Sequence, residues 1–169
     1  MLLKIILEIV VLCLILSLLL WILVGRGRGP LGGIQYYPEQ IQKAVVECGL
    51  MTEKDVRNQY ICSGLLIILI DIFVPFIMIY FINGGRFWWE FVWQWCILIM
   101  GQTLYDWLVI DVYWCCYTDF WIIPEVEDLT YKWRNPKYMT QKKMKLFLII
   151  PVLALIFGSL CYGISLLIP

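Results

Sequence analysis

Residues 101–128 read GQTLYDWLVIDVYWCCYTDFWIIPEVED, a stretch that begins inside a strongly apolar segment and ends in an acidic loop. Trp and Tyr are enriched where hydrocarbon meets water, and carboxylates placed among them are costly unless they have partners. The stretch holds the densest polar cluster of the chain, and its acidic residues are Asp106, Asp111, Asp119, Glu125, Glu127 and Asp128. It therefore marks the membrane–water boundary of an otherwise apolar chain.

The rest of the chain is apolar enough to predict an integral membrane protein. Of its 169 residues 62% are hydrophobic, and the mean hydropathy is +0.82. A soluble domain has about 45–50% apolar residues. Each of four apolar runs can cross a hydrocarbon core about 30 Å thick: residues 2–24, 61–82, 88–110 and 146–168. The sequence predicts one all-α, polytopic membrane domain over residues 1–169, with cytoplasmic loops at about residues 25–60 and 111–145.

The first loop is predicted to carry a short cytoplasmic helical pair between the first and second spans. Residues 25–33, rich in Gly and Arg, should be a flexible hinge. Pro38 suits a helix start and Gly49 a stop, and an apolar stripe at helical spacing includes Ile41, Val45 and Cys48. Residues 52–55 resemble a capping box and should begin a second helix. The pair is either a membrane-surface element packed on the protein or a docking surface for a partner.

Asp71 lies near the middle of the second span and Pro75 follows four residues later. Proline has no N–H, so the carbonyl of Asp71 loses its usual helical partner. Hydrocarbon offers no partner to that carbonyl or to the carboxyl group, so both should face neighbouring helices or a wet cavity. Asp71 is either a polar contact between helices or the functional centre of a polar path.

The third span carries further polar residues. At about 100° per residue, Gln102 and Asp106 share a stripe, whereas Asp111 points about 140° away from Asp106. The carboxylates therefore do not form one helical face, and we expect them to converge only if the chain bends after Ile110. In the first span, Lys4 and Glu8 are spaced to neutralise each other.

The distribution of Lys and Arg predicts the orientation. The two long loops hold eleven of the thirteen basic residues, and the opposite side holds Lys4 and Arg86. Positive charge favours the cytoplasm, so both termini should lie outside the cell (inner) membrane.

Several functions are excluded or disfavoured by composition. The net charge is zero, so no basic field indicates a nucleic-acid partner. The chain has no His, which removes the commonest metal ligand, and the sequence predicts no cofactor. The seven Cys contain no C-x-x-C and should be free thiols packed as small hydrophobes. An intramembrane aspartyl protease would need a Gly-x-Gly-Asp that this chain lacks.

Three hypotheses follow from these patterns. The first is an oligomeric transporter or channel whose polar path contains Asp71, Gln102 and Asp106. The second is a non-catalytic subunit or assembly factor of a membrane complex. The third is a membrane enzyme acting on a lipid head group, with Asp106, Asp111 and Asp119 holding a divalent ion. The acidic cluster otherwise pairs with Lys and Arg of the loops. Beside the lipid bilayer, the expected partner is a second copy or another membrane protein.

Overall fold

The computed structural model describes residues 2–25 and 29–168, which form helices and no strand. Four of these helices are long and apolar enough to cross a membrane. They are α1 (Leu2–Gly25), α3 (Glu53–Ile77) with its continuation η2 (Met78–Ile82), α4 (Trp88–Tyr105) with its continuation η3 (Asp106–Cys116), and α6 (Pro136–Ser165). Many of their Leu, Ile and Trp side chains point outward, as contact with lipid requires.

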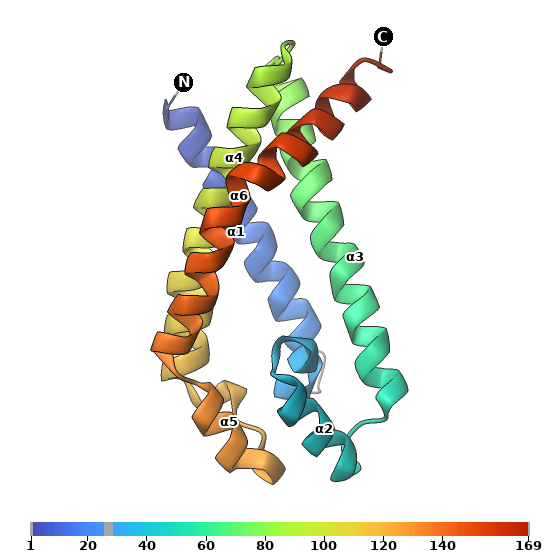
Figure 1. Cartoon of the computed structure of the whole chain (residues 1–169), viewed down its shortest axis with the longest axis vertical. Helices are drawn as coiled ribbons and strands as arrows, with labels where there is room; N and C mark the ends of the chain where they lie inside the picture. Colours follow the sequence, from blue (N-terminus) through green and yellow to red (C-terminus); the bar gives the residue numbers. More distant parts are fainter. Residues whose placement is uncertain (1, 26–28, 169) are drawn as a thin grey trace.

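Shorter elements close one end of the bundle. They are η1 (Gly29–Tyr36), α2 (Glu39–Glu47), η4 (Asp119–Trp121), η5 (Pro124–Val126) and α5 (Glu127–Trp133). Figure 1 shows α2 and α5 at the end opposite the last turn of α6 and the turn between α3 and α4. We call these two ends the loop end and the terminal end. In the same view α4 and α6 run side by side, and α3 stands apart from α6 towards the loop end.

The first loop is more ordered than predicted. The prediction of a flexible hinge is wrong for the part that the structure describes, because Gly29–Gly33 belongs to η1 and Gly32 is buried against α1. A Cβ on Gly32 would meet the carbonyl oxygen of Leu23 at 2.6 Å, so glycine permits this close approach. The part of the predicted hinge that contains Arg26 and Arg28 lies outside the described residues.

The helix predicted from Pro38 is confirmed as α2, whose N-cap is Pro38. Gly49 follows its end with φ +74°, which glycine adopts without strain. The apolar stripe is covered within the chain, since Ile41 and Val45 are 2% and 0% exposed, although Cys48 is exposed. The capping box formed by Thr52 and Asp55 is confirmed, but it opens α3 itself instead of a separate helix.

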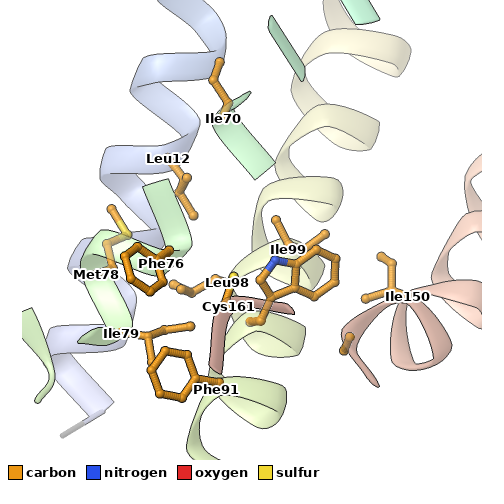
Figure 2. Packing of buried hydrophobic residues seen from close by; sticks show 12 residues of the cluster. Leu12, Ile70, Phe76, Met78, Ile79, Phe91, Leu98, Ile99, Ile150 and Cys161 are labelled. Carbon is orange, nitrogen blue, oxygen red and sulfur yellow. The ribbon is translucent and has the colours of Figure 1, made fainter. Parts of the chain in front are cut away.

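The main core lies in the terminal half of the bundle. Phe91, Trp95 and Leu98 of α4 are almost fully buried against the other spanning helices. Figure 2 shows Leu98 among Leu12, Phe76 and Ile79. A second core fills the loop end and joins α2, η1 and η4 to the ends of the spanning helices. At the start of α4 the aromatic residues are divided between surface and core: Phe87, Trp88 and Trp89 are exposed, whereas Phe91 and Trp95 form core.

Close packing of α4 on α6 depends on one glycine. A Cβ on Gly158 would lie 2.7 Å from the Cα of Val92, which is backbone and cannot rotate away. Gly158→Ala should therefore destabilise the fold by about 1–3 kcal/mol in detergent thermal unfolding. Gly163→Ala is the matched control, because nothing lies within 4 Å of a Cβ there. It should match or slightly exceed wild-type stability, since Ala favours helix by up to ~1 kcal/mol. Equal stability of the two variants would contradict this account.

Candidate functional site

Asp71 is bound twice by α4. Its backbone carbonyl, freed by Pro75, accepts a hydrogen bond from the indole Nε1 of Trp95 at 2.8 Å. Its carboxylate Oδ1 accepts one from the Nε2 of Gln102 at 3.2 Å. The sequence predicted that both groups face neighbouring helices or a wet cavity, and both bond to the neighbouring helix α4. The indole replaces the missing proline N–H as the donor to this carbonyl, while the carboxyl group lines the cavity between the helices.

Asp106 and Asp111 converge on one lysine. The Nζ of Lys143 donates to Asp106 and lies 3.3 Å from the Oδ2 of Asp111. We call Asp106, Lys143 and Asp111 the ion triad. The expectation that the two carboxylates diverge unless the chain bends is wrong. The chain continues as the π-helix η3, whose i→i+5 hydrogen bonds bring residues five apart onto one face.

Lys143 was missed by sequence reasoning, which placed it in a solvated loop. The helix α6 begins at Pro136, nine residues before the predicted loop ends at Lys145, and Lys143 is 8% exposed within this helix. Its side chain reaches the carboxylates of η3, while the neighbouring Lys142 stays exposed. One feature of the sequence could have identified this lysine. Asp106 and Asp111 lie in or next to an apolar span, where a charged carboxylate needs a cation as its partner.

A cavity of about 300 Å³, which we call the central cavity, connects Asp71 with the ion triad. Residues from all four spanning helices line it, and η1, Trp121 and Trp133 close its loop end. Its lining residues with charged, amide or hydroxyl groups are Tyr36, Asp71, Gln102, Thr103, Asp106, Asp111, Lys142 and Lys143. Two buried atoms in these walls have no partner: the Oε1 of Gln102 accepts nothing and the Nε1 of Trp121 donates to nothing. They leave the walls with one free acceptor and one free donor.

The loop end of the cavity is held by Arg134 and Tyr37. Arg134 donates to the carbonyls of Cys115, Cys116 and Thr118 at 2.8, 3.1 and 2.5 Å, which satisfies the last turn of η3. The hydroxyl of Tyr37 donates to the carbonyl of Trp121 at 2.8 Å. Burial raises the pKa of Tyr37 well above its ordinary value, so the hydroxyl stays protonated and remains a donor.

The predicted acidic cluster does not form one site. Asp106 and Asp111 line the cavity, whereas Asp119 lies 3.7 Å from Arg134 with an exposed side chain. A further set is exposed on the loop end and makes no ion pair within the described residues: Glu125, Glu127 and Asp128. Residues 2–25 and 29–168 also contain no group of three Asp, Glu or Cys side chains placed to hold a metal ion.

A third polar group lies near the terminal end. The Nδ2 of Asn83 donates to Glu8 at 3.0 Å and to Gln94 at 2.8 Å. Glu8 is 6% exposed, and its other oxygen has no partner. The predicted pairing of Glu8 with Lys4 is not formed, because the Lys4 amine donates to the carbonyl of Ile82.

Polar groups thus occur at three levels along α4 and its continuation η3, and an apolar layer separates the first from the other two. Gln94, Leu98 and Gln102 follow one another by single helical turns. Leu98 is 1% exposed and packs with Leu12 and Ile79, both 0% exposed (Figure 2). The layer separates the Glu8 group from the central cavity.

No protein family, curated protein or solved structure matches this chain.

Proposed function

We propose that this chain is a small membrane carrier that exchanges a solute for protons through the central cavity. The observation that carries the proposal is a cavity of about 300 Å³ among four membrane-length helices, with the Asp71 carboxyl group in its wall and an ion triad at one end. A carboxyl group in hydrocarbon is costly when charged, so Asp71 is suited to bind and release a proton as the cavity gains or loses water.

The distribution of polar groups supports a carrier more than an open channel. A path across the membrane needs polar groups at several depths, and this chain has them at Glu8, at Asp71 and at the ion triad. The layer of Leu12, Ile79 and Leu98 interrupts that path. A carrier must separate the side chains of this layer while it closes the opposite end of the path. The π-helical segments η2 and η3 and the proline of α3 are places where a helix can change course.

The two alternatives have less support. A membrane enzyme would use Asp106, Asp111 and Asp119 together, but Lys143 holds the first two and Asp119 lies beside Arg134. A docking subunit would present the apolar stripe of α2, but Ile41 and Val45 are buried. An open groove of about 560 Å³ between α2 and the start of α3 is one surface that a partner could still use.

The proposal is tested in proteoliposomes that enclose a pH-sensitive dye under an imposed pH gradient. The purified chain should allow solute-dependent proton movement that protein-free liposomes lack. The solute panel should contain organic cations, organic anions and neutral compounds of a size that fits the cavity. Proton movement unaffected by any of the three classes would contradict the carrier.

The orientation expected from the charge distribution is part of the proposal: both termini outside the cell membrane, with the loop end in the cytoplasm. Cys48 is an exposed thiol at the loop end and Leu167, at the terminal end, is 83% exposed. A membrane-impermeant maleimide should label a Leu167→Cys variant in intact cells. It should label Cys48 only after permeabilisation, and Cys48→Ser identifies that signal. Labelling of Cys48 in intact cells would reverse the orientation.

A further inference from the structure

We propose that the central cavity binds a monovalent organic cation with apolar or aromatic groups, and that this cation and a proton on Asp71 occupy the site in alternation. The inference rests on the proposed carrier function and names its substrate class.

The charges that line the cavity are one positive charge short. Three carboxylates, Asp71, Asp106 and Asp111, face two ammonium groups, Lys142 and Lys143. Lys143 is shared by both carboxylates of the ion triad, while Asp71 has only the neutral amide of Gln102. Net charge is costly in a buried site at membrane depth. One proton or one monovalent cation restores neutrality, so each can replace the other without leaving a net charge.

The walls favour an organic cation over a metal ion. Hard metal ions need several oxygen ligands, and the carboxylates of the ion triad are already engaged by an ammonium group. Most of the wall is aliphatic or aromatic, with Tyr36, Trp121 and Trp133 towards the loop end. Aromatic faces attract organic cations, and aliphatic walls bury their apolar groups.

The rim of the cavity points to entry from the lipid phase. Ile67 of α3 and Leu146 of α6 line the cavity, and each is 37% exposed. A cation with apolar groups partitions into the bilayer and reaches this rim directly, whereas a strongly hydrated ion does not.

Proton exchange at Asp71 takes place among other titratable groups. Asp106 and Asp111 face the cavity from η3, Lys142 and Lys143 from α6, Tyr36 from η1 and Cys115 from the end of η3. Asp71 is the carboxyl group in this set without a cationic partner. The step is therefore a simple exchange: the cation enters, the Asp71 proton leaves to water, and no bond other than O–H is broken.

The test is binding of benzyltrimethylammonium to the purified full chain in detergent, with benzenesulfonate as the matched anion. Equilibrium dialysis should show saturable binding of the cation that weakens as the pH falls, and none of the anion. In weakly buffered solution the wild type should release close to one proton per cation bound. Asp71→Asn should weaken cation binding by about tenfold or more and release no proton. Asp128→Asn, an exposed carboxylate outside the cavity, should bind as wild type does.

Two results would overturn the inference: equal binding of cation and anion, or cation binding without proton release from the wild type. The second needs no variant, so a folding defect of Asp71→Asn does not weaken the test. Proton movement driven by another solute class, without cation binding, rejects the cation and leaves the carrier standing. Cation binding with proton release but no flux in liposomes supports the site and rejects the carrier.

Discussion

Asp71→Asn is expected to abolish solute-dependent proton flux in proteoliposomes while the protein folds normally. Asparagine keeps an oxygen that can accept from Gln102, and the bond from Trp95 goes to the backbone carbonyl, which the substitution does not touch. The thermal unfolding temperature in detergent should therefore stay close to that of the wild type, since a neutral hydrogen bond contributes about 0.5–1.5 kcal/mol. The substitution removes the proton-binding carboxyl group of Asp71, which is the carboxyl group of the cavity that has no lysine partner.

Three carboxylates provide the comparison for this variant. Asp128 lies on the exposed loop end, so Asp128→Asn should leave flux unchanged. Asp111→Asn should reduce flux less than Asp71→Asn, because Lys143 retains Asp106 as a partner. If Asp71→Asn transports normally while Asp106→Asn and Asp111→Asn are inactive, the functional centre is the ion triad. The hypothesis of an enzyme at the membrane interface would then replace the carrier.

The sequence predicted the features of the fold that depend on local composition. Four apolar runs are long enough to span a bilayer whatever they pack against, so four spanning helices follow directly. The capping box of Thr52 and the stop at Gly49 depend on residues only a few positions apart. The freed carbonyl of Asp71 is likewise a local consequence of Pro75. Its acceptance of the indole of Trp95, twenty-four residues later, is a tertiary contact that no local pattern shows.

The sequence predicted part of the candidate site. The main error concerned the relative directions of the Asp106 and Asp111 side chains. A regular α-helix separates Asp106 from Asp111 around the helix, and nothing in the residues 106–116 signals that they adopt a π-helix. Lys143 was missed for a related reason: it belongs to a run of basic residues that resembles a loop, and only the packing of α6 on η3 buries it. Glu8 was assigned to Lys4 because i, i+4 pairs are common, but Asn83 from the neighbouring turn binds it.

Lys143→Met is expected to destabilise the protein more than any other single change in the cavity. The ammonium group of Lys143 lies between Asp106 and Asp111, and the lysine is 8% exposed. Removing it leaves two neighbouring carboxylates without a cation, and breaking a buried ion pair from one side costs about 3–5 kcal/mol. Thermal unfolding in detergent measures the loss. Lys142→Met is the control, because Lys142 is exposed and makes no ion pair with either carboxylate, so its unfolding temperature should change little.

The triple variant Asp106→Asn, Asp111→Asn, Lys143→Met separates the role of the triad in stability from its role in transport. Its three neutral side chains remove the uncompensated charges that Lys143→Met creates, and replacing a whole buried ion group is often close to neutral for stability. Most of the stability lost in Lys143→Met should therefore return. Flux should stay low even so, because the neutral triad removes one net negative charge. Asp71 and Lys142 then balance each other, and the cavity no longer requires a proton or a cation for neutrality. Recovery of both stability and flux would show that the triad only holds α6 against η3, whereas recovery of neither would show that the lysine contributes by packing instead of by charge.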